Sequence, residues 1–337
     1  MPSIPLVIAV TTLTTLVFTY IVRRYAIYKN ILDRPNARSA HSIPTPRGGG
    51  IAIVFTFLIG MLCLAILGIW PWPGLLGLGL AGAGVAIVGF LDDKGNITPK
   101  WRLLVHFTAA AIVLYTVGGL PALTMFGYPL SLGWLGNILA IIAIVWILNL
   151  YNFMDGIDGI AGIEALSALG IMAYLLLPVN SELSAIHILL AAAVSGFLVW
   201  NFPPAKIFMG DAGSGFLGLM LAALLLFSAS ASPALFWSWL IMLGVFIVDA
   251  TLTLIRRLIR GEKGYEAHST HAYQHATRKY GRHLPITLSV LMINLLWLSP
   301  IAFFVARGAL DGATGLCIAY APLVVLAYRF KAGKIDL

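Results

Sequence analysis

Paired aspartates are the residues of this sequence best suited to chemistry. Asp92 and Asp93 are adjacent, Asp155 and Asp158 are three residues apart, and Asp211 follows a short run that contains glycine. Each lies at the end of an apolar segment, where a charge in a membrane is costly unless a cation or a reaction needs it. Adjacent carboxylates repel one another, which raises a pKa or recruits a divalent cation. The sequence therefore predicts a metal-using site at a membrane.

The second pair belongs to a polar series with a spacing of three, Asn152, Asp155 and Asp158, which contains Gly156 and Gly159. Neighbours in such a series share one face of a helix, and glycines let a ligand approach the backbone. Two carboxylates and an amide suit Mg²⁺, which proteins usually hold together with substrate phosphates. A glycine-rich cap between two helices is the simpler alternative.

Asp211 closes a third motif, Asn201-x₆-Phe208-x-Gly-Asp211, which runs directly into an apolar segment. Backbone N–H groups at the start of the following helix can hold an anion. Phe208 offers a face on which a base can stack, although an aromatic residue is more often part of a core. The motif thus adds a third source of carboxylate and a possible platform for a nucleotide.

Two loops carry cationic side chains that can meet anions. The first, residues 33–50, is rich in proline and glycine, which predicts tight turns, and contains Arg38, His41 and Arg47. These side chains are expected to bind anions. Taken alone, the loop needs no explanation beyond a positively charged loop beside a membrane.

The second loop, residues 255–285, contains His268, His271 and His275 beside arginine and lysine. These histidines share one face if the segment is helical. Zinc is disfavoured because no cysteine lies nearby. Histidines among basic residues suit binding a pyrophosphate or shuttling a proton, and an ordinary basic loop at the membrane surface is the alternative.

The composition sets the class of protein in which these residues act. Of 337 residues, 60% are hydrophobic and only 10% are charged, and the mean hydropathy is +0.94. Soluble domains carry about 25% charged residues, so a polytopic membrane protein is predicted, all-α and with a single transmembrane domain over residues 1–337. The net charge of +8 does not indicate nucleic acid, because the basic residues cluster at the ends of apolar runs.

Eleven apolar runs are long enough to be candidate spans, each close to the roughly 20 residues that a membrane helix needs. They cover residues 3–22, 49–69, 74–91, 103–119, 132–150, 159–178, 185–201, 214–230, 235–254, 286–304 and 312–328. The first run has no basic residue before it and no small-residue cleavage site after it. It is therefore expected to be a retained span with its N-terminus outside.

The basic residues predict the orientation. Eleven spans with the N-terminus outside and the C-terminus inside place 20 of the 21 Lys and Arg residues in the cytoplasm, leaving Arg307 outside. The motif loops then share the cytoplasmic face, at about residues 23–48, 92–102, 151–158, 202–213 and 255–285. One ionisable residue, Asp249, falls inside a span. Two roles stay open for it: pairing with Arg256 or Arg257, or belonging to the site.

Together these motifs resemble the polyprenyl-phosphate N-acetylhexosamine-1-phosphate transferase family, over essentially the whole chain. The family includes the enzymes that make the first lipid-linked peptidoglycan precursor and those that start O-antigen, enterobacterial common antigen and teichoic acid linkage units. The resemblance implies that the phosphate of undecaprenyl phosphate attacks the β-phosphorus of a UDP-N-acetylhexosamine. UMP is released, and Mg²⁺ (with Mn²⁺ as an alternative) assists. It also implies a bacterial inner-membrane protein with its site on the cytoplasmic side.

The resemblance also implies roles for individual residues. Asp211, Asp155 and Asp92 are expected as metal ligands, with Asp92 as a candidate base or lipid-phosphate orienting group beside Asp93. Asn152, Asp155 and Asp158 would hold the nucleotide and metal-linked water, and the uracil would meet Asn201 and Phe208. The diphosphate would meet His268 and His271, and Arg38, His41 and Arg47 would bind substrate anions.

The sugar is the finer part of the resemblance. The peptidoglycan branch has three adjacent histidines, whereas here they are spread as His268-x₂-His271-x₃-His275. The segment from Glu266 to His275 is most similar to O-antigen-initiating enzymes, some of which use 6-deoxy sugars such as N-acetylfucosamine or N-acetylquinovosamine; N-acetylglucosamine is the other expectation. The oligomeric state stays open, a homodimer included.

Two other classes compete with this interpretation. A transporter of an anionic or lipid-linked substrate would place ionisable residues near the middle of the membrane, but here most carboxylates lie at the ends of apolar runs. The CDP-alcohol phosphotransferases also have paired aspartates, but their Asp-Gly-x₂-Ala-Arg signature is absent, because Ile-Ala-Gly162 follows Gly159.

Overall fold

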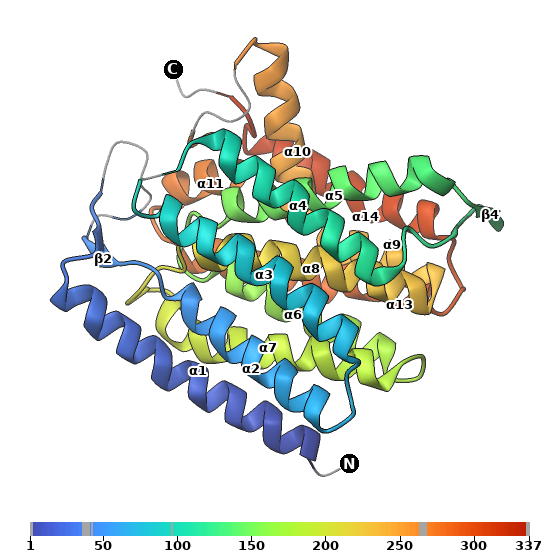
Figure 1. Ribbon diagram of the computed structural model, residues 1–337. Helices are drawn as coiled ribbons and strands as arrows, with labels where there is room; N and C mark the ends of the chain where they lie inside the picture. Colours follow the sequence, from blue (N-terminus) through green and yellow to red (C-terminus); the bar gives the residue numbers. More distant parts are fainter. Residues whose placement is uncertain (1–2, 36–40, 42, 96, 263–267, 335–337) are drawn as a thin grey trace.

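The chain folds into a bundle of long apolar helices (Figure 1). The computed structural model describes residues 3–35, 41, 43–95, 97–262 and 268–334. Its helices are α1 (Ser3–Tyr28), α2 (Gly50–Ile66), α3 (Trp72–Asp92), α4 (Pro99–Val117), α5 (Gly133–Met154), α6 (Ile160–Leu176), α7 (Ser181–Asn201), α8 (Asp211–Ala231), α9 (Pro233–Met242), α10 (Gly244–Ile259), α11 (Ala272–Tyr280), α12 (Leu284–Ile293), a π-helical turn η1 (Asn294–Leu298), α13 (Ser299–Ala306) and α14 (Gly312–Arg329).

Two short antiparallel pairs complete the described structure. β1 (Leu32–Asp33) pairs with β2 (Thr45–Pro46), and β3 (Leu123–Met125) pairs with β4 (Tyr128–Leu130). The first pair closes the basic loop before α2, and the second closes a link between α4 and α5. Neither pair contributes a sheet to the core, so the predicted all-α class is confirmed.

Among the described residues, seven helices have the length and composition of a membrane span, or eight if the bent pair α9 and α10 counts as one. The predicted eleven runs all fold as helices, but α2 and α6 have only 17 residues each. Such a helix is about 25 Å long, short for a hydrocarbon layer of about 30 Å. α4 begins with a polar turn that contains Lys100 and Arg102. The multi-pass class is confirmed, whereas fewer than eleven helices meet the span criteria.

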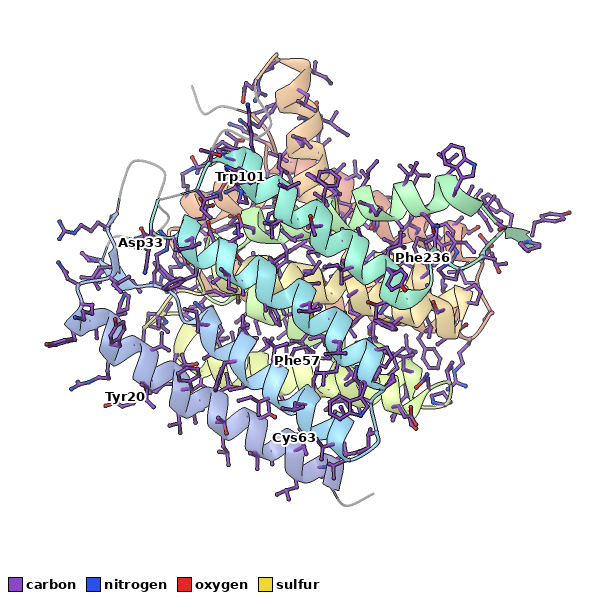
Figure 2. All side chains as sticks on the ribbon, in the orientation of Figure 1. Tyr20, Asp33, Phe57, Cys63, Trp101 and Phe236 are labelled. Carbon is purple, nitrogen blue, oxygen red and sulfur yellow. The ribbon has the colours of Figure 1, made fainter. Side chains whose placement is uncertain are left out.

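Helix α8 is the centre of the bundle. Its span window is 94% buried, against 17% for α1, which lies at the edge of the bundle (Figure 1). Gly213 makes a close approach possible, because a Cβ there would lie 2.5 Å from the Cα of Gly50. Small residues at helix crossings are typical of membrane bundles. Figure 2 shows the resulting division, with Phe57 inside the bundle and Tyr20 on its outer surface.

A bend interrupts the ninth predicted span. α9 and α10 meet at 68° around Leu243, and α10 projects from the bundle in Figure 1. As a consequence, α10 leaves the packed bundle at the end of the molecule where the motif loops lie. The histidine segment, which follows α10 in the chain, lies at that end.

Candidate active site

The first basic loop and the Asp211 motif are joined by backbone hydrogen bonds. The N–H of Phe208 donates to the carbonyl of Pro46 (2.8 Å), and the N–H groups of Gly49 and Gly50 donate to the carbonyls of Phe208 (2.9 Å) and Met209 (2.8 Å). Two motifs some 160 residues apart in the sequence therefore form one wall. Since the starts of α2 and α8 are in contact through Gly50 and Gly213, this wall is fixed to the core of the bundle.

Asp93 organises the charged side of this wall. One of its oxygens, Oδ1, forms an ion pair with Arg47 and accepts the backbone N–H of Asp211 at 3.1 Å. Its other oxygen is buried and has no hydrogen-bond partner among the described residues. Burial raises the pKa of Asp93, and the Arg47 guanidinium opposes this rise.

Asp211 receives the remaining contacts. Arg47 lies 3.9 Å from its Oδ1. The amide of Asn152 donates to the same oxygen (3.2 Å) and to Ser214 Oγ (2.8 Å). Asn152 lies on the last turn of α5 and Asp211 on the first turn of α8. The predicted association of these two motifs is therefore present in the structure.

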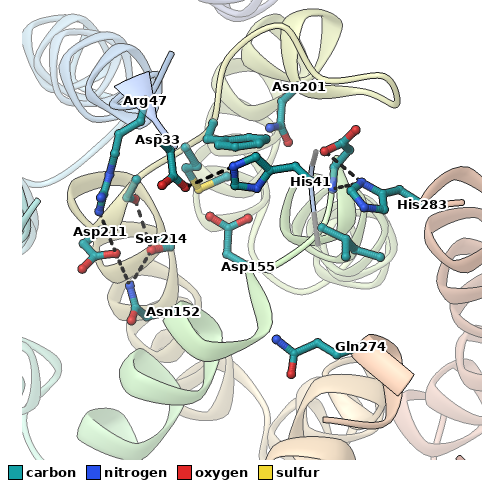
Figure 3. A pocket seen from close by; sticks show the side chains of 16 residues that line it. Asp33, His41, Arg47, Asn152, Asp155, Asn201, Asp211, Ser214, Gln274 and His283 are labelled. Carbon is teal, nitrogen blue, oxygen red and sulfur yellow. Dashed lines mark hydrogen bonds and ion pairs between the residues drawn. The ribbon is translucent and has the colours of Figure 1, made fainter. Parts of the chain in front are cut away.

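A cavity of about 240 Å³ opens between these groups. Figure 3 shows the side chains around it. Its lining comes from the first loop, the α5–α6 link, the α7–α8 link and two later segments: Asp33, His41, Arg47, Asn152, Asp155, Gly156, Ile157, Asp158, Asn201, Phe208, Met209, Gly210, Asp211, Ser214, Gln274 and His283. Eight of the predicted site residues are among them, which makes this cavity the candidate active site.

Among the carboxylates that line the cavity, Asp155 has the pKa most raised by its surroundings. It follows the last turn of α5, where the backbone leaves the helix. Burial, together with the negative charges of Asp211, Asp93 and Asp158, raises the pKa of Asp155 to about 7. A buried group of like charges is stabilised by a cation, so this part of the cavity favours a positively charged ligand.

Asp158 is held from two other segments. Its Oδ1 lies 3.0 Å from His283 Nδ1, and its Oδ2 accepts the N–H of Ala205 at 2.9 Å. Thr287, one turn into α12, donates to the Asp158 carbonyl at 2.8 Å. Both carboxylate oxygens are therefore engaged within the protein, and Asp158 ties the α5–α6 link to α12 and to the α7–α8 link.

Asn201 and Phe208 differ in what they offer to a ligand. The Oδ1 of Asn201 accepts the N–H of Gly159 (3.0 Å), and its Nδ2 donates to the Ile207 carbonyl (2.9 Å). The Asn201 side chain therefore links the α5–α6 and α7–α8 loops, and both ends of its amide are hydrogen-bonded within the protein. Phe208 is partly exposed, and its ring meets that of His41 edge-on with centroids 4.9 Å apart. The Phe208 face is the aromatic surface available in the lining.

Asp92 lies outside the cavity. Its carboxylate forms an ion pair with Arg102 at the start of α4 and is not among the lining groups. The structure thus separates the adjacent aspartates, because Asp93 turns toward Arg47 and Asp92 toward the α3–α4 link. The predicted role of Asp92 as a metal ligand or base stays a prediction without a contact to support it.

His268 and His271 also lie outside the cavity lining. His271 is 3% exposed, and its Nδ1 lies 3.4 Å from Asp249. Asp249 accepts the N–H groups of Ala272 (2.9 Å) and Tyr273 (3.0 Å), so it caps the start of α11. Among the described residues, Asp249 contacts His271 and the start of α11 and is not part of the lining of this polar cavity, so the aspartate anchors the histidine segment.

His268 packs on His271 with ring centroids 4.8 Å apart. Burial lowers the pKa of His268 to about 3, with His271 and Arg257 acting in the same direction. A neutral His268 has no charge to offer a diphosphate, so the predicted electrostatic role does not follow from this geometry. Arg38, the remaining predicted anion-binding residue, lies outside the described residues.

No group of three or more His, Cys, Asp or Glu side chains in the described ranges has the geometry of a complete metal site. The residues nevertheless fit a hard cation bound together with a substrate. The unpartnered Oδ2 of Asp93 and the raised pKa of Asp155 both indicate excess negative charge. Mg²⁺ usually takes one or two carboxylates and fills its other positions with water and phosphate. Among the predicted site carboxylates that line the cavity, both oxygens of Asp158 are engaged within the protein, which leaves Asp155 and Asp211 to serve it.

The sequence did not indicate Asp33, Gln274 or His283, which complete the lining. Gln274 lies within the histidine segment and His283 at the end of the same loop. Their proximity to the predicted site residues in the chain was the one feature of the sequence that could have indicated them. Their contribution depends on how α11 and α12 fold back over the α5–α6 link, which no local pattern predicts.

A second cavity, of about 600 Å³, lies on the other side of α11. It is mainly apolar and is lined by residues of α10, α11, α12 and α14, among them Tyr273, Ala276, Ile286, Leu326 and Phe330. α11 therefore separates a polar cavity, which receives Gln274, from an apolar one.

Comparison with known proteins gives consistent matches. The glycosyl transferase family 4 matches residues 75–229. A probable undecaprenyl-phosphate N-acetylglucosaminyl 1-phosphate transferase of Bacillus subtilis is 32% identical over 295 residues, which cover 85% of this chain and 80% of the relative. The decaprenyl-phosphate N-acetylglucosaminephosphotransferase of Mycobacterium tuberculosis is 30% identical, over 88% of this chain and 81% of its own. An undecaprenyl-phosphate alpha-N-acetylglucosaminyl 1-phosphate transferase of Thermotoga maritima is 26% identical, over 85% and 88%.

Proposed function

Because the chain belongs to glycosyl transferase family 4, we propose that it transfers an N-acetylhexosamine-1-phosphate from a UDP-sugar to undecaprenyl phosphate and releases UMP. The observation that carries the proposal is the cavity itself. It gathers Asn152 and Asp155 with Asp211 and the Phe208 ring from two distant segments, in a chain related over most of its length to enzymes named for this transfer.

The residues divide the work of phosphoryl transfer, which asks mainly for positioning and for neutralisation of charge. Arg47 is fixed by Asp93 and lies 3.9 Å from Asp211, so its guanidinium is placed to meet a substrate phosphate. Asn152 fixes the orientation of Asp211. Mg²⁺, when bound by Asp155 and Asp211, would neutralise charge on the diphosphate. The acceptor phosphate is itself a nucleophile, so no aspartate needs to attack.

The nucleotide is proposed to lie toward Phe208. The ring is partly exposed in the cavity and offers a stacking face. Asn201 and Asp158 are engaged by backbone groups and His283, so we assign them to shaping this end of the cavity. Direct hydrogen bonds from the Asn201 amide to uracil are not part of the proposal.

The apolar cavity is proposed to receive the polyprenyl chain of the acceptor. Apart from Asp249 and Ser289, its lining is made of aliphatic and aromatic side chains from α10, α11, α12 and α14, and burial of each CH₂ of a chain contributes about 0.8 kcal/mol. The cavity borders Asp249 and Tyr273, which anchor and form the first turn of α11. Gln274, the next residue, lines the polar cavity, so the two cavities are separated by a single helix.

The membrane arrangement is proposed to be the eleven-span one, in the bacterial inner membrane, with the N-terminus outside and the cavity facing the cytoplasm. The segments that line the cavity coincide with the loops that hold the basic residues, and the positive-inside rule places such loops in the cytoplasm. A UDP-sugar is a cytoplasmic metabolite class that this orientation can reach.

The product is proposed to start a lipid-linked polysaccharide of the cell envelope, with O-antigen as the specific pathway. The histidine segment from His268 to His275 supports the O-antigen branch. The donor is proposed to be UDP-N-acetylglucosamine, the sugar in the names of the relatives, or a 6-deoxy N-acetylhexosamine.

The test is UMP release by detergent-solubilised protein supplied with undecaprenyl phosphate, Mg²⁺ and a panel of UDP-sugars. Release that requires both substrates and stops on chelation with EDTA is expected. The panel also identifies the sugar, since the preferred donor has the highest kcat/KM. No release with any UDP-sugar would overturn the proposal and favour a transporter.

A further inference from the structure

The amide of Gln274 has a defined orientation. Gln274 is the third residue of α11, and its Oε1 accepts the backbone N–H of His271 at 3.1 Å. A backbone N–H can only donate, so the atom facing it must be the carbonyl oxygen of the side chain. This reciprocal contact is a capping box, which satisfies a donor that the helix itself leaves unpaired. The orientation of the amide therefore follows from chemistry.

The consequence is that the Nε2 of Gln274 faces the candidate active site. Gln274 lines the polar cavity, and in Figure 3 its nitrogen points toward Asp155 while its oxygen points away. Among the described residues, Nε2 has no hydrogen-bond partner. Gln274 therefore presents two N–H donors to the cavity, while its only acceptor, Oε1, is already bonded to the backbone of His271.

The position of Gln274 in the cavity determines which part of the UDP-sugar it can contact. In Figure 3, Asp155 lies between Asn201 and Gln274, and Asn201 belongs to the end that we assign to the nucleotide. Arg47 and Asp211, which we assign to the diphosphate and its cation, come from the α2 and α8 side. Gln274 therefore borders the remaining part of the cavity, where the group beyond the diphosphate must extend.

We propose that Gln274 is a sugar-recognition residue that donates a hydrogen bond to the acetamido carbonyl oxygen of the N-acetylhexosamine. The inference rests on the proposed function and names the chemical group of the UDP-sugar that this residue would recognise. A carbonyl oxygen only accepts, which matches a side chain left with donors alone. A hydroxyl also carries a hydrogen that needs an acceptor, which Gln274 does not supply because its Oε1 accepts the N–H of His271.

Two substitutions separate the hydrogen bond from its side effects. Gln274→Glu keeps the oxygen that caps α11, since glutamate serves the same capping box, but it removes the donors and adds charge. Gln274→Met has similar length and no charge, but it loses both the donors and the cap. An effect that both variants share belongs to the lost donors, because the charge and the cap change in only one variant each.

The experiment measures binding of UDP, of the preferred UDP-N-acetylhexosamine and of the corresponding UDP-hexose by calorimetry on solubilised protein with Mg²⁺. Both variants should bind the acetamido sugar about 10-fold more weakly than wild type, as expected for an unpaired amide acceptor in a partly buried site. The affinities of Gln274→Met for UDP and for UDP-hexose should be unchanged, whereas a weakening of all three ligands in Gln274→Glu alone would reflect its added charge.

Three results would overturn the inference. Equal weakening of UDP would mean that Gln274 acts only through the fold of α11. Equal weakening of UDP-hexose would place the contact on another part of the sugar. An effect in one variant alone would assign it to charge or to the cap. Wild-type UMP release is measured in parallel: if it is present, these results refute only the role of Gln274, whereas its absence refutes the proposed function as well.

Discussion

At the residue scale, the structure divides five motif aspartates into different roles. Asp93 orients Arg47 and the start of α8, Asp158 joins three segments, and Asp92 pairs with Arg102 outside the cavity. Asp155 and Asp211 remain as carboxylates that face the cavity. Close spacing in the sequence therefore does not mean shared chemistry, because successive side chains at the end of α3 project about 100° apart and meet different arginines.

Asp211→Asn should lower UMP release by roughly 100-fold or more, because a catalytic metal ion stabilises transition-state charge by several kcal/mol. The hydrogen bond from Asn152 can turn to the remaining amide oxygen, so folding should be preserved. The measurement is turnover against Mg²⁺ concentration, with Glu182→Gln, an exposed substitution on the first turn of α7, as the control. Turnover near that of the control would remove Asp211 from the metal site.

His268 should not contribute to the pH dependence of the reaction between pH 6 and 8. Its pKa in the folded protein is about 3, so it stays neutral throughout that range. The ordinary pKa of histidine is about 6.5, so between pH 6.5 and 3 the unfolded chain binds a proton that the folded chain does not. The stability contributed by His268 is therefore present above pH 6.5 and is lost progressively as the pH falls.

His268→Asn tests both statements. Its pH profile of kcat/KM should overlay the wild-type profile between pH 6 and 8, while the fall in melting temperature from pH 7 to pH 5 should be smaller than in wild type. A profile that loses an ionisation near neutral pH in the variant would show that His268 titrates in the active protein.

The sequence predicted half of the residues that line the candidate site but missed part of its rim. Asn152, Asp155 and Asp211 were predictable because polar residues at the ends of apolar runs are costly without a function. Gln274 and His283 were not, because a glutamine on a short polar helix and a histidine before a span are ordinary at any membrane surface. Their role appears when α11 and α12 place them against the α5–α6 link.

At the element scale, α11 is the component that gives the two cavities their different character. Its first residues are capped by Asp249 and its third faces the polar cavity, while Tyr273, Ala276 and Tyr280 line the apolar one. The strong contrast between its faces allows a nine-residue helix to serve both. An ordinary basic loop at the membrane surface was the alternative for this segment, and in the structure α11 also contributes side chains to both cavities.

The segment after α14 holds the histidine loop in place. The N–H of Gly333 donates to the Thr270 carbonyl (2.6 Å), Arg256 donates to the Ala332 carbonyl (2.7 Å), and His275 lies 3.1 Å from the Lys334 carbonyl. Gly333 has a φ of +73°, and a Cβ there would lie 2.9 Å from Arg256 Cβ. Neither the conformation nor the space suits another residue.

Gly333→Ala should therefore loosen the loop that leads into α11 and lower turnover. Left-handed backbone costs a non-glycine residue about 1–2 kcal/mol, and the contact with Arg256 adds to that. Gly308→Ala is the matched control, since Gly308 has a φ of +70° with no atom within 4 Å of its Cβ position. Hydrogen exchange at Thr270–Tyr273 should rise only in Gly333→Ala. Equal exchange in both variants would show that the segment after α14 does not hold the histidine loop in place.

The apolar cavity can be tested on α14 with adjacent residues. Leu326→Trp places a large ring in the cavity, whereas Val325→Trp adds the same ring to the exposed face of the helix, since Leu326 lines the cavity and Val325 is 65% exposed. Leu326→Trp should raise the KM for undecaprenyl phosphate several-fold and leave the KM for the UDP-sugar unchanged. Equal effects of the two substitutions would place the polyprenyl chain elsewhere.

At the scale of the whole molecule, the bundle brings together substrates of opposite solubility. A central apolar α8 and the close crossings around it hold the polar cavity at one end, and the apolar cavity opens beside it across α11. The all-helical class follows from composition, because backbone groups in lipid must be satisfied within each segment. The bend of 68° between α9 and α10 had no signal in the hydropathy, since both halves are apolar.

The proposed orientation rests on 20 of 21 basic residues lying in loops on one side, and it can be tested without activity. In a Cys63→Ser, Cys317→Ser background, Tyr128→Cys marks the β3–β4 turn and Lys100→Cys the start of α4; both positions are exposed. Four of the proposed spans precede the β3–β4 turn, so an N-terminus outside places Tyr128 outside as well, while Lys100 follows the third span and lies inside. A membrane-impermeant maleimide should label the Tyr128 position in intact spheroplasts and the Lys100 position only after permeabilisation. The reverse pattern would mean that the protein has the opposite orientation, with the candidate site on the side without UDP-sugars. Labelling of both positions in intact spheroplasts would mean that α4 does not cross the membrane.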